Sequence, residues 1–166
     1  MKTVISLFSV MLLAAMLVGM VGCQSGPEVK DYTPTLARFF LENTTDRSVG
    51  VTLPQSGVQV AVGSKPVFTE GDIVNVELMQ VDLGKCLMFQ LTPTAARDLY
   101  RVSASNQGRR LVLVLNDIAV GARRLDGPLG EGALLVFVEL PDASLPAVVQ
   151  NLKKTSAALQ KAASRK

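Results

Sequence analysis

Side chains able to catalyse a reaction are few in this chain, and their spacing forms no familiar catalytic arrangement. There is no histidine, which removes the most common general base and the most common metal ligand. The closest carboxylate pairs, of the kind that glycoside hydrolysis requires, are Glu70 with Asp72 and Glu131 with Asp142. Both pairs fall in predicted turns and helix caps. We therefore expect no enzymatic activity, no cofactor and no bound metal.

The two cysteines lead to different expectations. Cys86 is predicted to be a small, half-buried apolar side chain. No histidine is present to activate it as a nucleophile, and an intermolecular disulfide in an oxidising compartment remains an open alternative. Cys23 follows an apolar run, Val4–Val21, that begins just after Lys2 and ends in small residues. A basic start, an apolar segment and small residues before a cleavage position are typical of a secretory signal peptide.

The end of that segment, Met-Val-Gly-Cys at residues 20–23, resembles a bacterial lipobox, with Met20 in place of the usual Leu. The resemblance implies a lipoprotein signal peptide over residues 1–22, acylation of Cys23 with fatty acids such as palmitate, and stable membrane anchoring. An uncleaved membrane anchor and ordinary secretion with a free Cys23 remain open alternatives. Gln24 follows in place of Asp, which in similar lipoproteins favours the outer membrane over the inner membrane.

Length and charge limit what the rest of the chain can be. The 166 residues predict one domain beyond the leader, which we place at residues 36–160, with a basic, frayed tail at 161–166. Residues 23–35 form the lipidated cysteine and a flexible tether of about 12 residues, which reaches at most ~40 Å. Without the leader the chain has 16 basic and 14 acidic residues, a net charge too small to suggest nucleic acid as a partner.

Patterns of apolar residues predict the elements of this domain. We expect a strand at Lys85–Leu91, a helix between the N-cap Thr92 and Gly108, and a buried strand at Arg110–Leu115 that turns back at residues 116–117. Further strands are expected at Leu36–Glu42, Val49–Leu53, Val58–Val62, Val74–Val81, Ile118–Ala122 and Ala133–Leu140.

Two helices are predicted to bury one face each. The first has its inward positions at Ala96, Leu99, Tyr100 and Ser103. The inward positions of the second, near the end of the chain, are Leu145, Val148, Val149, Leu152 and Leu159. Together the elements predict an α+β fold, a two-layer sandwich in which two main helices cover one face of a mixed, mostly antiparallel sheet.

The order of several segments resembles the first periplasmic (head) domain of SecD, a subunit of the bacterial preprotein translocase. The matching segments are Leu36–Glu42 (LARFFLE), Phe68–Ile73 (FTEGDI), Cys86–Leu91, Thr92–Gly108, GRRLVLVLND, IAVGAR, GPLGEG and the closing helix. The resemblance covers about Leu36–Leu159 and implies a mixed sheet packed on helices that handles translocated polypeptide. SecD also has transmembrane helices with a proton-coupled carboxylate. We expect none here after the leader, so no proton-driven step is implied.

Four arginines form the sharpest candidate binding feature. If residues 116–117 close a two-residue turn, counting back places Arg110 opposite Arg123 and Arg109 opposite Arg124. Like charges directly opposite each other are unfavourable by up to ~1 kcal/mol, so this cluster needs acidic partners or a bound anion.

Two interpretations of the arginine cluster remain open. In one, the arginines are solvated or pair locally with Asp98, Asp126, Glu131 or Asp142. In the other, they contact anionic lipid headgroups or the acidic surface of a partner.

The sequence therefore predicts a non-catalytic, lipid-anchored cell-envelope protein facing the periplasm. Its SecD-like domain would be a protein-binding or scaffolding module for an exported polypeptide or an envelope protein. The alternative is a structural lipoprotein whose basic cluster contacts an anionic membrane surface. A binding module should expose an apolar groove or a sheet edge, whereas a membrane-leaning protein should place its four arginines on the same side as Leu36.

Overall fold

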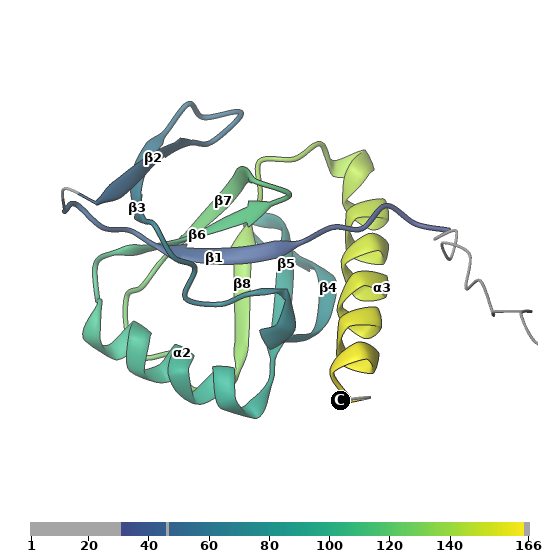
Figure 1. Cartoon of the computed structure of the whole chain (residues 1–166). Helices are drawn as coiled ribbons and strands as arrows, with labels where there is room; N and C mark the ends of the chain where they lie inside the picture. The colour runs from purple at the N-terminus through teal and green to yellow at the C-terminus, as the bar shows by residue number, and fades with distance from the viewer. Residues whose placement is uncertain (1–30, 46, 165–166) are drawn as a thin grey trace, which may run out of the picture. The chain divides into compact units, whose positions relative to one another are not determined.

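Eight strands and two α-helices make up the part of the chain that the computed structural model describes, residues 31–45 and 47–164 (Figure 1). The strands are β1 (Ala37–Leu41), β2 (Ser48–Thr52), β3 (Gln59–Gly63), β4 (Ile73–Val81), β5 (Gly84–Leu91), β6 (Arg110–Leu115), β7 (Ile118–Arg124) and β8 (Ala133–Phe137). The helices are α2 (Pro93–Ser105) and α3 (Leu145–Ala163), with short 3-10 turns η1 (Glu70–Asp72) and η2 (Asp142–Ser144).

The strands pair antiparallel in three sheets, with the orders β1–β6–β7, β2–β3 and β4–β5–β8. This arrangement confirms the predicted α+β class. The β1–β6–β7 and β4–β5–β8 sheets meet at a single bridge between Gly121 of β7 and Val138. Because the backbones approach so closely there, a Cβ at Gly121 would overlap the carbonyl oxygen of Phe137.

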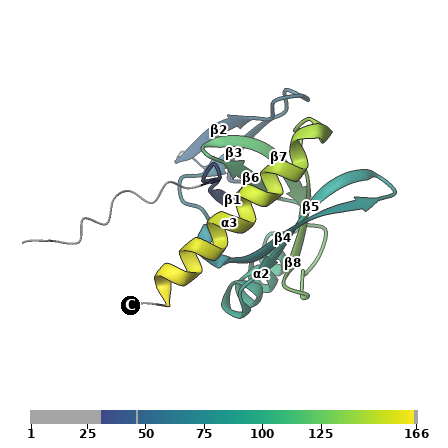
Figure 2. The same ribbon diagram turned by 90° about the vertical axis from the view of Figure 1, so that its right-hand side faces the viewer.

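Both helices pack on one hydrophobic core, as predicted. Leu99 of α2 and Leu152 of α3 are buried in the same cluster as Phe39 of β1 and Phe89 of β5. The rings of Phe39 and Phe89 meet edge to face, with their centroids 5.0 Å apart. Figures 1 and 2 show α2 at the bottom of the molecule and α3 beside β4.

Helix α2 begins at the N-cap predicted from sequence, but its buried face differs from the predicted one at Tyr100. The Thr92 hydroxyl accepts a hydrogen bond from Ala95 N at 3.3 Å, and Pro93 occupies the first turn. The buried face is Ala95, Leu99 and Ser103, whereas Tyr100, predicted to face inward, is 52% exposed. Ser103 Oγ donates to the Leu99 carbonyl at 2.7 Å, so the hydroxyl of this buried side chain is satisfied within the helix.

The buried face of α3 is Leu145, Val149 and Leu152, followed by Thr155 rather than the predicted Leu159, which is 37% exposed. The helix continues to Ala163, into the segment predicted to be a basic tail.

The β2–β3 hairpin covers the other face of the β1–β6–β7 sheet. Val60 and Val62 of β3 form a second buried cluster with Val112 and Val114 of β6. Residues 111–115 of β6 are all buried. This confirms the prediction, made from their continuous apolar run, of a strand covered on both faces.

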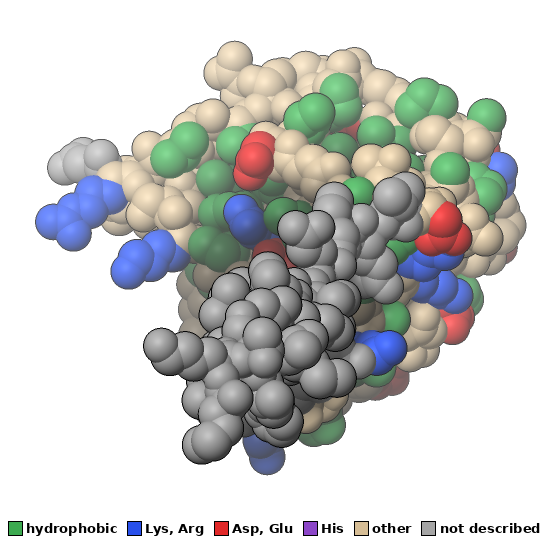
Figure 3. All heavy atoms as spheres, turned by 45° about the vertical axis from the view of Figure 1, so that its right-hand side comes forward, with side chains coloured by type: hydrophobic (Ala, Val, Ile, Leu, Met, Phe, Trp, Pro, Cys, Tyr) green, Lys and Arg blue, Asp and Glu red, His purple; other side chains and the backbone are tan. Residues whose placement is uncertain are grey.

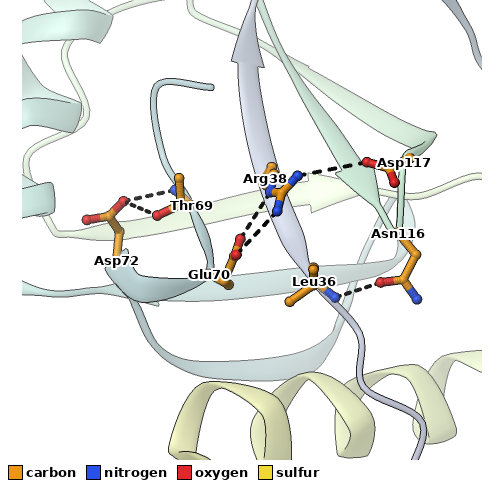
Figure 4. Close-up of polar contacts among 7 residues, drawn as sticks. All are labelled: Leu36, Arg38, Thr69, Glu70, Asp72, Asn116 and Asp117. Atoms are coloured by element: carbon orange, nitrogen blue, oxygen red, sulfur yellow. Dashed lines mark hydrogen bonds and ion pairs between the residues drawn. The ribbon is translucent and has the colours of Figure 1, made fainter. Parts of the chain in front are cut away.

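Polar contacts tie the beginning of β1 to its neighbours (Figure 4). Leu36 N donates to Asn116 Oδ1 at 2.8 Å, in the β6–β7 turn, and Arg38 Nε donates to Glu70 Oε2 at 3.2 Å. Thr35 N, within the segment predicted to be tether, donates to Thr155 Oγ1 of α3 at 3.0 Å. The compact unit accordingly begins at Tyr32, a few residues before the predicted boundary at 36.

Candidate functional site

Strand β2 has an open edge. Among the described residues, β2 pairs with β3 alone, and β3 in turn meets the end of β1. Leu53 N donates to the Val58 carbonyl at 2.9 Å, and bonded pairs alternate along an antiparallel ladder. The backbone groups of Gly50 and Thr52 therefore point away from β3, towards solvent.

An apolar groove lies beside this edge, between the hairpin and the face of β1 and β6. Its volume is about 160 Å³. Its lining residues are Phe40, Val49, Val51, Val62, Gly63, Ser64, Val114 and Asp117. We call it the β2 groove. Val49, which lines the groove, is 53% exposed.

A second hollow, which we call the basic cleft, continues from the β2 groove through Gly63 and Ser64. Its volume is about 380 Å³. Its lining residues are Leu41, Asn43, Thr45, Arg47, Gly63, Ser64, Lys65, Val67 and Arg109. No described carboxylate lines it. Figure 3 shows Lys and Arg side chains projecting from the left edge of the molecule, where β1 ends and β2 begins.

The hairpin that carries both hollows is held at its two ends. At its base, Asn43 N donates to the Ala61 carbonyl at 2.8 Å. At its tip, Gln55 N and Ser56 N both donate to Glu139 Oε2 at 2.8 Å. The hydrogen bonds from Ser56 and then from Gln55 lower the pKa of Glu139 below its ordinary value. A fixed hairpin presents its open edge without first having to be ordered.

The predicted register of the four arginines is wrong by one residue. Leu115 does pair with Ile118 across the Asn116–Asp117 turn, whose residues have φ values of 45° and 69°. A β-bulge between Leu113 and Val114 then shifts the ladder. Consequently Arg110 lies opposite Arg124, and Arg123 lies opposite Leu111.

Two of the four arginines have acidic partners. Arg110 forms two bonds to Glu42, from Nε to Oε2 at 3.1 Å and from Nη2 to Oε1 at 3.0 Å. Arg124 Nε lies 3.2 Å from Asp126 Oδ1, one of the partners predicted from sequence.

The other two arginines separate. Arg123 Nη1 donates to the Leu135 carbonyl at 3.1 Å, and its buried Nε has no hydrogen-bond partner among the described residues. Arg109 lines the basic cleft and has no carboxylate within 4.0 Å among those residues. The structure thus brings Arg109 together with Arg47 and Lys65, not with the other three arginines.

Sequence reasoning missed Arg47 and Lys65. Both lie in turns, one directly before β2 and one two residues after β3, where basic side chains are ordinary. The antiparallel pairing of β1 with β6 brings Asn43 and Arg109 to one end of the sheet. Arg47 and Lys65 come close to Arg109 only through this pairing. The signal for the bulge was present, since a glycine inside a strand pattern, here Gly121, often marks a bulge or a close approach.

Three of the four carboxylates considered for catalysis have structural partners, and the fourth, Glu131, is exposed. Glu70 bonds Arg38, and Asp72 Oδ2 accepts from Thr69 N at 2.8 Å. Asp142 pairs with Lys85 at 3.0 Å. In residues 31–45 and 47–164, no three Cys, Asp or Glu side chains gather as a metal ion would require.

Cys86 is fully buried rather than half-buried. Burial raises the pKa of its thiol, and the nearby Arg123 guanidinium opposes this only in part. A protonated, buried thiol suits packing rather than nucleophilic attack.

Cys23 and the whole predicted signal peptide lie outside the described residues. Across residues 31–45 and 47–164, no helix has both the length and the apolar character needed to span a membrane.

Comparison with known proteins identifies the fold. No family profile matches the sequence, and no curated protein matches it. Among solved structures, a SecDF chain described as a membrane component that enhances protein export is similar over 72% of this chain and 62% of its own, with 16% identity and a TM-score of 0.56. SecDF in a super-membrane-facing form matches 72% of this chain and 18% of its own, with 16% identity and a TM-score of 0.57. The chain thus spans less than two thirds of either neighbour, and its described domain has the SecD-like fold predicted from sequence.

Proposed function

We propose that this protein is a non-catalytic, lipid-anchored envelope protein whose SecD-like domain binds extended polypeptide in the periplasm. The observation that carries the proposal is the open edge of β2 beside the apolar β2 groove. The fold likeness to SecDF, described as enhancing protein export, supports an exported polypeptide or an envelope protein as the partner.

Binding would follow β-strand addition. The outward backbone groups of Gly50 and Thr52 would pair with an extended chain, which supplies affinity without regard to sequence. Apolar side chains of that chain, on the face shared by Val49 and Val51, would lie towards the β2 groove. With only five residues in β2, the complex would be weak and reversible, as suits a chain in transit.

The anchor is the part of the proposal that rests on sequence. Acylation of Cys23 would hold the domain by a tether that ends at Tyr32, where the compact unit begins. Gln24 after the cysteine supports the outer membrane over the inner membrane.

The alternative, a structural lipoprotein that leans on the membrane through its arginines, has less support. Leu36 lies at the β6–β7 turn, bonded to Asn116. Arg110 and Arg124 lie at the opposite end of the same two strands, where Arg110 meets Glu42 beyond the end of β1. The arginines are therefore at the far end of β1 from the point where the chain enters the domain.

A single backbone amide tests the proposal. Thr52→Pro removes the outward N–H of Thr52 at an edge position that tolerates proline, whereas Thr52→Ala keeps it. The measurement is binding of a short fluorescent peptide in which Val and Thr alternate between Ser flanks. We expect Thr52→Pro to weaken binding at least about tenfold, and Thr52→Ala to bind like the unmodified protein. Equal binding by both variants would contradict strand addition at β2.

A further inference from the structure

The basic cleft holds positive charge that the described part of the protein does not neutralise. Arg47, Lys65 and Arg109 all line it and are exposed. Five other described cations each have a carboxylate within 4.0 Å: Arg38, Lys85, Arg101, Arg110 and Arg124. Asp46, which precedes Arg47 in the sequence, lies outside the described residues. Three cations around one hollow, with no described carboxylate in its lining, provide a site for an anion.

The chemistry of the lining suits a carboxylate. Asn43, Thr45 and Ser64 add side chains that can donate hydrogen bonds to oxygen, and Leu41 and Val67 supply apolar wall. A charge-assisted contact of Arg or Lys with a carboxylate is stronger than a neutral hydrogen bond.

The position of the cleft relates it to β2. Arg47 directly precedes the first residue of β2, Ser48, which pairs with Gly63 at the end of β3. Gly63 and Ser64 line both the β2 groove and the basic cleft. A strand added to the edge of β2 and continuing past Ser48 would therefore leave the apolar groove and meet the three cations.

We infer that the basic cleft selects extended polypeptides in which Asp or Glu residues follow an apolar stretch, at the end that passes Ser48. This inference rests on the proposed function and adds the charge of the partner to it. A lipid surface is the less favoured occupant, because the cleft lies at the far end of β1 from Leu36, near which the chain enters the domain.

The test compares three fluorescent peptides with the same alternating Val–Thr centre and with Glu, Ser or Lys flanks. The unmodified protein should bind the Glu-flanked peptide about tenfold more tightly than the Ser-flanked one, and the Lys-flanked peptide most weakly. The differences in affinity among the three peptides should disappear at high salt, because the cations of the cleft are exposed and are screened there.

Two triple variants with the same net charge separate the cleft from overall charge. Arg47→Gln, Lys65→Gln and Arg109→Gln together should abolish the preference while keeping the affinity for the Ser-flanked peptide. The control combines Arg97→Gln, Lys153→Gln and Lys161→Gln, at exposed helix positions without a described ion-pair partner, and should keep the preference.

The outcomes distinguish the inference from the function beneath it. Binding of the Ser-flanked peptide with no preference for Glu overturns the inference alone. No binding of any peptide overturns both. If the control variant also loses its preference for the Glu-flanked peptide, net charge rather than the basic cleft causes the preference, and the inference is wrong. If phosphatidylglycerol vesicles bind in a way that needs the three cleft cations while the peptides show no preference, the cleft is a lipid site and the inference is wrong.

Discussion

Arg110, at the start of β6, and Arg124, at the end of β7, differ in how far their acidic partners are buried. The Glu42 side chain is 19% exposed and accepts three bonds from Arg110, one from its backbone, whereas Asp126 is 79% exposed and meets Arg124 once. We predict that Glu42→Ala lowers the free energy of unfolding by about 1–2 kcal/mol. Asp126→Ala should change it by less than about 0.5 kcal/mol.

Chemical denaturation of the two purified variants measures this difference. Similar losses for both would mean that the Glu42–Arg110 contact is no stronger than an ordinary surface pair.

Glu139 should make the hairpin tip sensitive to acid. Its pKa is lowered in the folded protein by the bonds from Ser56 and Gln55. A lowered folded pKa means that the ionised group stabilises the fold above its ordinary pKa of 4.5, and that this stabilisation is lost as pH falls through the folded value. The amide resonances of Gln55 and Ser56 should therefore titrate by NMR with a midpoint below 4.5.

The matched control is Glu139→Gln, in which the same two amides should show no such transition. A midpoint at or above the ordinary value would contradict the bonding seen at the tip.

At the scale of elements, the contact between β7 and β8 depends on one glycine. A Cβ at Gly121 would press on the backbone of Phe137 and lie 3.2 Å from Val138 Cα, and backbone atoms have no rotamer with which to move aside. We predict that Gly121→Ala lowers the free energy of unfolding by about 3 kcal/mol or prevents soluble expression. Gly50→Ala in β2, where nothing lies within 4 Å, should stay within about 0.5 kcal/mol.

Thermal and chemical unfolding of the two alanine variants provides the check. Equal stability of both would show that β7 and β8 can separate without loss.

Elements whose signals are local could be predicted from the sequence. Thr92 with Pro93 began α2, and the apolar run of β6 indicated a strand covered on both faces. The arginine cluster failed because its register was counted along an unbroken ladder, and one bulged residue moved Arg123 out of line with Arg110. Register, unlike element type, depends on contacts between distant segments. Here that contact is the β-bridge between Gly121 and Val138, next to the end of β8.

The candidate site was the harder case for the same reason. An open edge is a property of the whole sheet arrangement, and nothing in the sequence of β2 distinguishes an edge strand from a paired one. The basic cleft gathers side chains from three separate segments, of which only Arg109 belonged to a predicted cluster.

For the whole molecule, the proposed anchor predicts a simple labelling result. Cys23→Ser should abolish labelling by radioactive palmitate, because the sulfur that would carry the acyl group is replaced. Labelling that persists in the Cys23→Ser protein would contradict acylation at Cys23.

The central claim is that the β2 edge and groove bind polypeptide in the cell envelope. The most direct measurement is photo-crosslinking in intact cells from a reactive residue placed at Val49, which is 53% exposed beside the groove, with Lys153 on α3 as the control position. We predict crosslinks to exported or envelope polypeptides from Val49, strongly reduced by Thr52→Pro, and few from Lys153. Crosslinks to lipid alone from Val49, or a polypeptide pattern identical at Val49 and Lys153, would contradict the account.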